Sequence, residues 1–324
     1  MEQPSMSYIR VFAPATVANV VCGFDVLGFA VETPGDEVEL FVVSEPGVRL
    51  RAIYGDEGRL PLDPTKNTVS ASVMRYLQQI GRDDLGIEIV LHKHMPVGSG
   101  LGSSAASTVA GLFAIHHLMG QPLSTADLLQ LAMEGEELAC GQGHADNVAP
   151  ALLGGFVLIR SYHPLDVIQL PTPESLVCGL LHPHIEIQTR DARKILKPYV
   201  PLSDVTTQMG NLAGFISALY NQDFALLARS MHDVIIEPVR SILIPEYQAL
   251  KSIALSSGAL GFGISGSGPS VFALCEHFTT AETILSRLQA HLQQHHIASD
   301  VFISPINRQG PRLLATGETV HKKS

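Results

Sequence analysis

The amino-acid sequence predicts a two-domain protein of mixed strands and helices. The chain has 324 residues, which suits two domains of ordinary size, and 46% of its residues are hydrophobic. Short apolar runs typical of strands, such as residues 87–91, occur among longer helical patterns, such as residues 105–118. A third observation is a polar, proline-containing segment at residues 161–164, where we expect the domain boundary. The predicted domains are therefore residues 1–163 and 164–324.

The composition excludes several classes of function. The net charge of −10 opposes binding to nucleic acid or to an anionic membrane. No apolar run approaches the ~20 residues of a membrane span, and residues 1–10 lack the apolar core of a signal peptide. We expect a cytoplasmic protein with small-molecule substrates. Its isolated cysteines are then buried thiols in a reducing compartment: Cys22, Cys140, Cys178 and Cys275.

A glycine-rich turn between an apolar run and a helical pattern carries the clearest chemical signal. Glycines reach backbone angles that other residues avoid, and they leave no Cβ to block an anion. The first N–H groups of a helix are unpaired and lie at its positive end. The combination predicts a phosphate site, with a plain turn and a serine cap as the structural alternative. The turn consists of Pro96, Val97, Gly98, Ser99, Gly100, Leu101, Gly102, Ser103, Ser104, Ala105 and Ala106.

Two common nucleotide-binding motifs, the Walker A loop and the dinucleotide motif, do not fit this turn in full. A Walker A loop needs a lysine after its last glycine, whereas Gly102 is followed by Ser103. Residues 100–105 satisfy the relaxed dinucleotide pattern G-x-G-x-x-[GA]. However, the acidic residue expected about 20 positions later is missing from residues 116–122. A nicotinamide-dependent dehydrogenase therefore ranks as a second hypothesis.

The string P-x-G-x-G-L-G-S-S-A-A at residues 96–106 resembles the ATP loop of the GHMP kinases at every defined position. Segments 14–28 and 261–274 resemble the first and third motifs of that family, in family order. Three further segments resemble its homoserine kinase branch: residues 144–155, 189–198 and 233–245. The resemblance implies an α+β protein with the two-domain GHMP kinase fold: an N-terminal domain like domain 2 of ribosomal protein S5 and a ferredoxin-like C-terminal domain.

The resemblance also implies a reaction. It is the ATP- and Mg²⁺-dependent phosphorylation of the L-homoserine hydroxyl to O-phospho-L-homoserine, a step toward threonine. Another small alcohol, such as mevalonate, is the alternative substrate within the family. A non-catalytic sensor on the kinase scaffold is a further alternative. A homodimer is expected by resemblance only.

Several residues receive an ATP-side role from the resemblance. The loop amides from Gly98 to Ser104 would hold the phosphates, and Ser104 with Glu136 would hold Mg²⁺ through hard oxygen atoms. Asn67 and Val69 would border the adenine pocket. As an alternative, Asn67 is simply a helix N-cap.

The acceptor side is predicted in the same way. Asn19 and Asp25 would bind the substrate ammonium group, and Arg193 with Arg240 would bind its carboxylate, because guanidinium groups present paired donors. His144 and Asn147 would line the reacting end, with Asn147 near the attacking hydroxyl. The residues with catalytic roles are then Ser104, Glu136, Asn147 and Arg240.

Three positions leave questions open. Val21 stands where homoserine kinases often carry glycine. Asp146 occupies the position of the catalytic aspartate of mevalonate kinases, and we expect that it is not essential as a base. The alternating pairs His92/His94 and His182/His184 could each share a strand face with a metal. Neither pair has a third clustered ligand, so the sequence favours a non-metal role.

Overall fold

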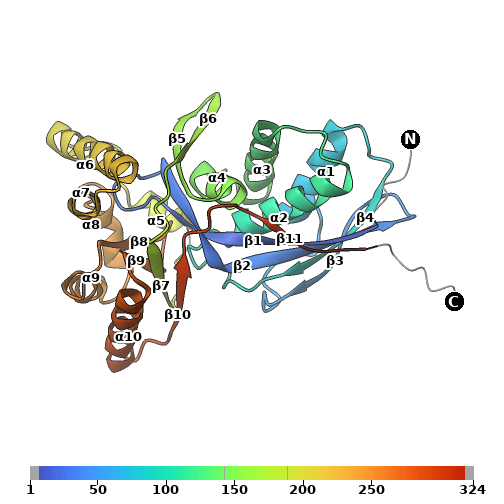
Figure 1. Ribbon diagram of the computed structural model, residues 1–324. Helices are drawn as coiled ribbons and strands as arrows, with labels where there is room; N and C mark the ends of the chain where they lie inside the picture. The colour runs from blue at the N-terminus through green and yellow to red at the C-terminus, as the bar shows by residue number, and fades with distance from the viewer. Residues whose placement is uncertain (1–6, 142, 188, 318–324) are drawn as a thin grey trace.

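The structure, a computed structural model, describes residues 7–141, 143–187 and 189–317. It contains two β-sheets, and each sheet carries helices of its own (Figure 1). The α+β class and the two-domain organisation expected from the sequence are both present. Among the described residues, no helix is long and apolar enough to cross a membrane.

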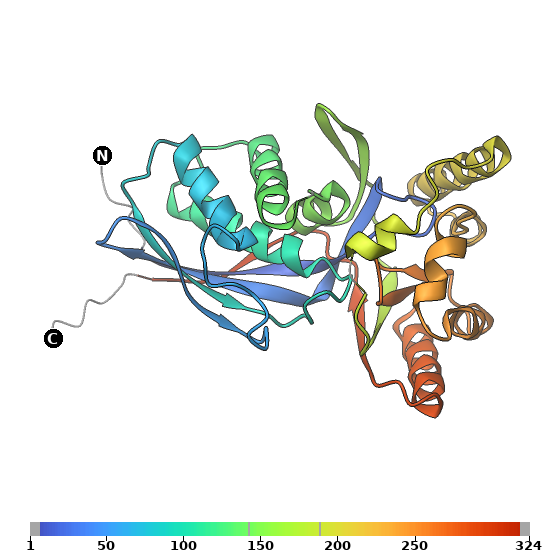
Figure 2. The same ribbon diagram turned by 180° about the vertical axis from the view of Figure 1, so that it is seen from behind.

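The larger sheet has the strand order β11-β1-β2-β4-β3, and β2 also pairs with β5, which pairs with β6. Helices α1 to α4 lie on one side of this sheet in both views (Figure 1 and Figure 2). The strands are β1 (Tyr8–Ala18), β2 (Leu27–Val43), β3 (Gly47–Tyr54), β4 (Gly86–His92), β5 (Phe156–Tyr162), β6 (Leu165–Leu170) and β11 (Arg312–Gly317). The helices are α1 (Thr68–Gln79), α2 (Ser103–Leu118), α3 (Thr125–Cys140) and α4 (Ala145–Leu153).

Helix α2 is the centre of the larger domain. It contacts β1, β2, α1, α3 and α4, and its residues are buried on nearly every side. A helix that is apolar all round is stable only in such a surrounded position. The helix therefore anchors the glycine-rich turn, which leads directly into it.

The smaller sheet is antiparallel throughout, with the order β10-β7-β9-β8. Helix α10 (Phe278–Gln294) covers it with a stripe of residues that are at most 2% exposed: Ala281, Ile284, Leu285, Leu288 and Leu292. This is the closing amphipathic helix that the apolar spacing predicts. The other elements are β7 (Val177–Pro183), β8 (Gly261–Ile264), β9 (Val271–Cys275), β10 (Ser299–Pro305), α5 (Thr189–Lys194), α6 (Leu202–Asn221), α7 (Phe224–Ser230), α8 (Glu237–Arg240), η1 (Ser241–Leu243) and α9 (Tyr247–Ser256).

The sheets divide the chain differently from the predicted boundary at residues 163/164. That position lies in the β5–β6 hairpin, and both strands belong to the larger sheet. Strand β11 also returns to the larger sheet, where it pairs with β1. The division into residues 1–163 and 164–324 therefore needs correction, because antiparallel pairing joins segments that lie far apart in the chain.

The cysteine prediction agrees with the structure where it can be compared. Cys22, Cys178 and Cys275 are free and buried. The side chain of Cys140 and residues 1–6, the first part of the segment in which we looked for a signal peptide, lie outside the described part of the chain.

Candidate active site

A cavity of about 580 Å³ lies where the two domains meet. Its walls come from the glycine-rich turn, the β1–β2 loop, the end of α3, the start of α4, helices α5 and α8, and the β8–β9 loop. The acceptor-side residues predicted from the sequence all line it: Asn19, Asp25, His144, Asn147, Arg193 and Arg240. So do the two predicted Mg²⁺ ligands and most of the turn, whereas Pro96, Val97, Leu101 and Ala106 do not line the cavity.

The glycine-rich turn has the backbone that an anion site requires. Gly98, Gly100 and Gly102 have φ angles of 78°, 80° and 67°. Helix α2 begins at Ser103 and its N-cap is Gly102, which among the described residues makes no side-chain cap hydrogen bond. The structure therefore does not have the serine cap offered as the alternative, and residues 102–105 at the start of α2 line the cavity. A Cβ atom on Gly102 would lie 1.9 Å from Thr16 Oγ1, so only glycine fits there.

The β8–β9 loop lies against the turn, as the third motif implies. Ser265 Oγ donates to the Gly100 carbonyl at 2.8 Å, and the Ser270 amide donates to the Ser99 carbonyl at 3.2 Å. Within the part of the chain that the structure describes, the buried Ser99 hydroxyl has no hydrogen-bond partner. The two loops thus form one wall, with a polar atom left available.

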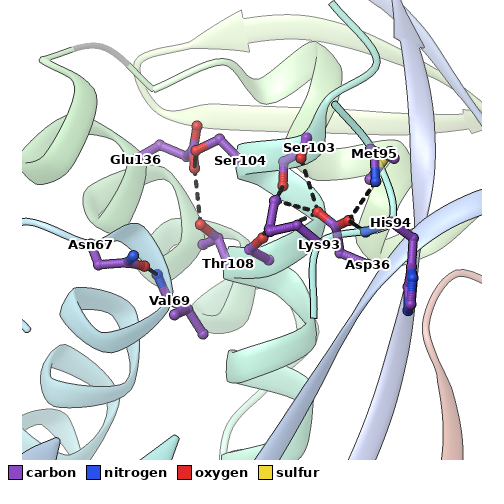
Figure 3. A network of polar contacts seen from close by, with 11 residues as sticks. Asp36, Asn67, Val69, Lys93, His94, Met95, Ser103, Ser104, Thr108 and Glu136 are labelled. Carbon is purple, nitrogen blue, oxygen red and sulfur yellow. Dashed lines mark hydrogen bonds and ion pairs between the residues drawn. The ribbon is translucent and has the colours of Figure 1, made fainter. Parts of the chain in front are cut away.

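A buried network of charged and polar side chains supports the glycine-rich turn at the start of α2 (Figure 3). Lys93 Nζ pairs with Asp36 and also donates to the Ser103 carbonyl at 2.9 Å and to Ser107 Oγ at 2.7 Å. Asp36 in turn accepts from Ser103 Oγ at 3.0 Å and from the His94 amide at 2.9 Å. The side chains of Lys93 and Asp36 are 3% and 0% exposed. The network fixes the first turn of α2 to the sheet.

Sequence reasoning missed this network. The histidines on either side of Lys93 drew attention to a metal, whereas the lysine points inward from the strand end. A lysine on the buried face of an apolar strand needs a carboxylate partner, and this was the available signal. Its partner could not be identified, because Asp36 lies 57 residues away in the chain.

The predicted Mg²⁺ ligands are in contact. Glu136 Oε1 accepts hydrogen bonds from Ser104 Oγ at 2.6 Å and from Thr108 Oγ1 at 2.9 Å. Figure 3 shows Glu136 next to Ser104 and above Thr108. Burial raises the pKa of Glu136, and the two hydroxyl bonds act against that shift. Thr108, one helical turn after Ser104, is a further site residue that the sequence did not reveal.

The acceptor side joins an acid and two arginines. Arg193 donates to both carboxylate oxygens of Asp25, at 2.9 and 3.0 Å, and this bond raises the pKa of Arg193. Arg240 donates to the carbonyls of Ala192 and Gly266, both at 3.2 Å. The sequence assigned Asp25 and Arg193 to opposite groups of the substrate and did not anticipate that they bond to each other.

Phe24 is the aromatic residue that both arginines share. The guanidinium carbons of Arg193 and Arg240 lie 5.5 and 5.0 Å from the centre of its ring. Such cation–π contacts attract each guanidinium group to the ring and offset part of the repulsion between the two like charges. The sequence had placed Phe24 inside the first motif without giving it a role.

The β1–β2 loop that carries Asn19 and Asp25 has a strained backbone. Asn19, Val20 and Val21 have φ angles of 73°, 42° and 60°, and Asp25 has 59°. Positive φ is rare for any residue with a Cβ and is a true outlier for valine. Asn19 holds the turn closed, because its Oδ1 accepts from the Asp25 amide at 2.9 Å and its Nδ2 donates to Gly266 at 2.8 Å. Val21 thus adopts the conformation that glycine would adopt without strain.

Helix α4 and its N-cap residue His144 present three polar side chains to the cavity. Asn147 Oδ1 accepts from Thr16 Oγ1 at 2.8 Å. Asp146 is 2% exposed, and its Oδ1 has no partner among the described residues. Burial, and then the charge of Asp25, raise the pKa of Asp146 to about 7. Burial, and then the charge of Arg193, lower the pKa of His144.

Asn67 and Val69 lie outside the cavity wall. Asn67 is the N-cap of α1 and accepts from the Val69 amide at 3.3 Å. The side chain of Val69 is buried in the core. The structure therefore has the N-cap that the sequence offered as the alternative, and a role at the adenine stays a prediction.

The two histidine pairs make separate contacts. His92 Nε2 lies 2.6 Å from Glu39 Oε1, and His94 Nε2 lies 3.6 Å from Glu37 Oε1. His182 bonds to the Ser270 hydroxyl at 3.0 Å, and His184 pairs with Asp300 at 2.9 Å. In the described residues, neither pair gathers the three clustered ligands of a metal site.

Comparisons with known proteins agree with this geometry. The family model for the GHMP kinases N terminal domain matches residues 67–155, and that for the GHMP kinases C terminal region matches residues 215–294. A homoserine kinase of Chlorobium phaeovibrioides is 47% identical over 320 residues, which are 95% of this chain and 100% of that relative. A homoserine kinase of Chlorobaculum tepidum is also 47% identical, over 96% of this chain and 99% of its own length.

Solved structures give the same result. The crystal structure of homoserine kinase from Cytophaga hutchinsonii has a TM-score of 0.94 and 54% identity, and it covers 97% of this chain and 99% of its own. A mevalonate kinase of L. major has a TM-score of 0.70 at 16% identity, over 94% of this chain and 99% of its own, which shows a shared fold alone. The two-domain GHMP kinase fold inferred from the motifs is confirmed. The chain belongs to the homoserine kinases of the GHMP kinase family.

Proposed function

We propose that this chain transfers the γ-phosphoryl group of ATP to the hydroxyl of L-homoserine, giving ADP and O-phospho-L-homoserine in threonine biosynthesis. The observation that carries the proposal is the joining of two features in one cavity. A glycine-rich helix start lies at one end, and an aspartate with two arginines lies at the other.

The phosphate end supplies positioning and positive potential. The amides of residues 98–104 would bind the β- and γ-phosphates, and the positive end of α2 would stabilise their charge. Phosphoryl transfer needs mostly such positioning and charge stabilisation.

Ser104 and Glu136 would hold Mg²⁺. The site fits this ion, because a buried carboxylate and hydroxyl groups converge beside the turn and offer hard oxygen atoms. When bound there, Mg²⁺ would supply neutralisation of the charge on the phosphate oxygens. Thr108 would orient the Glu136 carboxylate through its hydrogen bond.

The acceptor end suits a zwitterionic amino acid. Asp25 uses two carboxylate positions for Arg193 and keeps further lone pairs for an ammonium group. Arg193 Nε is buried without a partner among the described residues, and Arg240 lies beside it over Phe24. These donors would bind the substrate carboxylate, while Asn19 holds Asp25 in place. His144 and Asn147 would line the space of the reacting hydroxyl.

The proton of the hydroxyl need not pass to a protein base in this proposal. Burial raises the pKa of Asp146 to about 7, so its protonation state changes near neutral pH and does not by itself decide whether it acts as a base. As the resemblance to the homoserine kinases implies, we propose direct handover of the proton to the phosphoryl group, with charge stabilisation by the site. The contribution of Asp146 is then electrostatic.

The test is ADP release with Mg-ATP, with L-homoserine, L-serine, L-threonine, mevalonate and galactose offered in parallel. We expect a strong preference for L-homoserine. Activity on mevalonate or a sugar alone would keep the phosphate end and overturn the acceptor assignments. Thermal stabilisation by NAD(P) but not by Mg-ATP would favour the dehydrogenase, and absence of any ADP release would favour the sensor. The comparisons favour neither of these alternatives.

We also propose a cytoplasmic homodimer that binds neither nucleic acid nor membrane. The charge of −10 supports the last two points. Light scattering on the purified chain tests the dimer, since a mass of one chain at micromolar concentration would contradict it. Fractionation of cells tests the location, and cosedimentation with DNA or anionic vesicles tests the expected lack of binding.

A further inference from the structure

Three potential metal ligands meet in the smaller domain, away from the cavity. They are Glu246, His291 and His295, and none of them lines the active site. Glu246 Oε2 lies 3.0 Å from His291 Nε2 and 3.6 Å from His295 Nε2. One ligand atom from each residue lies within 4.8 Å of the other two. Among the described residues, these three are the one group of His, Cys, Asp or Glu side chains whose ligand atoms all lie within 4.8 Å of one another.

The fold explains why these side chains converge. His291 and His295 are four residues apart at the C-terminal end of α10, so their rings lie on the same face, with centres 4.7 Å apart. Glu246 is the N-cap of α9 and has a φ of 61°. Helices α9 and α10 pack side by side (Figure 1), which brings the carboxylate to the end of α10.

The distances match a tetrahedral ion. Zinc binds imidazole nitrogen at 2.0–2.1 Å and carboxylate oxygen at 2.0–2.2 Å, so the ligand atoms of a tetrahedral site lie about 3.4 Å apart. The two distances from Glu246, 3.0 and 3.6 Å, lie on either side of that value. The third distance of the site joins the two imidazole nitrogens, and rotation of the exposed His295 ring would adjust it to the same value.

The donor set selects the kind of ion. Imidazole suits Zn²⁺ and its transition-metal neighbours, whereas Mg²⁺ requires oxygen ligands. The side chains of His291, Glu246 and His295 are 20%, 34% and 46% exposed, so an ion can enter from solvent. A simple ion pair between a protonated histidine and Glu246 is the competing explanation, and it requires no metal.

We propose that Glu246, His291 and His295 form a three-ligand site for Zn²⁺, with water as the fourth ligand. The ion joins the start of α9 to the end of α10. Glu246 follows η1, which begins directly after Arg240, so the site also tethers the segment that leads from the acceptor end of the cavity into the core of the smaller domain.

Metal titration of the full chain tests the site. The protein is treated with EDTA, dialysed, and titrated with ZnCl₂ by calorimetry. The His295→Gln and Glu246→Gln variants are compared with a His296→Gln control, because His296 is a neighbouring exposed histidine outside the cluster. We expect one Zn²⁺ per chain for the wild type and the control, and an affinity at least about tenfold weaker in the two ligand variants.

Two further measurements keep the result clear. Bound Co²⁺ should produce the intense visible absorption of a tetrahedral site in the wild type and the control. Excess Mg²⁺ should not displace the bound Co²⁺. Zn²⁺ should raise the Tm of the same two proteins, while all the proteins share one Tm without metal. Equal Zn²⁺ affinity in all four proteins, or no Zn²⁺ binding by the wild type, overturns the proposal.

Discussion

The two ends of the cavity use ion pairs of different exposure. Beneath the phosphate turn, the side chains of Lys93 and Asp36 are 3% and 0% exposed, and further hydrogen bonds satisfy both. At the acceptor end, the side chains of Arg193 and Asp25 are 34% and 31% exposed, and one buried nitrogen of Arg193 has no partner among the described residues. The first pair is complete without ligand, whereas the second retains unused donors and acceptors for one.

This difference separates support from recognition. A buried and fully bonded pair cannot exchange partners without a large cost, so it holds the backbone that binds phosphate. A half-exposed pair can share its atoms with an incoming charged group. The comparison yields four predictions, which run from the largest expected effect to the smallest.

Replacing Lys93 should cause the largest loss of stability. The Lys93→Met variant leaves the Asp36 carboxylate buried without a cation, and removal of one partner of such a pair costs about 3–5 kcal/mol. Urea unfolding measures the change. The control is Arg160→Met, which breaks an exposed pair with Asp166 and should cost less than about 1 kcal/mol. Equal losses in the two variants would contradict the supporting role of the buried pair.

Replacing Arg240 should mainly affect recognition of the acceptor. We expect Arg240→Met to lower kcat/KM for L-homoserine about 10²- to 10³-fold, because loss of a buried charged partner costs about 3–4 kcal/mol. The KM for ATP should change little. Steady-state kinetics with 3-amino-1-propanol, which lacks the carboxylate, supplies the control. An equal loss with that analogue would show that Arg240 does not bind the carboxylate.

Replacing Asp146 should remove a destabilising contribution to the free energy of unfolding, and the size of this contribution depends on pH. Its pKa is about 7 in the folded chain and near 3.8 in the unfolded chain, so between these values the folded state binds the extra proton. The stability contribution of Asp146 therefore falls as the pH rises through 7. We expect Asp146→Asn to be more stable than the wild type at pH 8, on the order of 2 kcal/mol, with a smaller difference at pH 5.

Unfolding of the two proteins at both pH values measures this difference, and a larger gain at pH 5 would contradict the burial argument. The same variant tests the absence of a base. We expect its kcat to fall by less than about 10³-fold, since base catalysis contributes about 10²–10⁴-fold. A larger loss in a folded variant would restore Asp146 as the base.

Replacing Val21 should have the smallest effect. Val21→Gly loses the burial of one valine but removes a backbone strain of about 1–3 kcal/mol, so we expect a net cost of about 1 kcal/mol. Val17→Gly is the matched control, because Val17 is also buried, at 0% exposure against 5% for Val21, and lies in β1 without a positive φ. It should cost about 3 kcal/mol. Equal costs in urea unfolding would show that Val21 is not strained.

Local backbone requirements explain what the sequence could predict. Gly100 and Gly102 predict the phosphate turn, because the turn needs positive φ at fixed positions. The apolar stripe of α10 likewise predicts which face of that helix is buried. The motifs also indicated that Asp25 and Arg193 belong to one site, although not that they bond to each other.

Contacts between residues far apart in the chain are what the sequence could not predict. Asp36 and Lys93, and likewise Glu246 and His291, come from separate elements that meet only in the folded chain. No local periodicity relates such residues. The domain boundary at residues 163/164 needs correction because this position lies in the β5–β6 hairpin of the larger sheet, and because β11 returns from beyond the smaller domain to pair with β1.

Strand β11 also affects how this protein can be made. During synthesis, β1 emerges before the smaller domain, whereas β11, which covers the outer edge of β1, follows the whole of that domain. The larger sheet thus keeps an open edge until β11 has been synthesised, and unpaired edges favour association with other chains. For the same reason, expression of the N-terminal half by itself would yield a larger sheet that lacks β6 and β11.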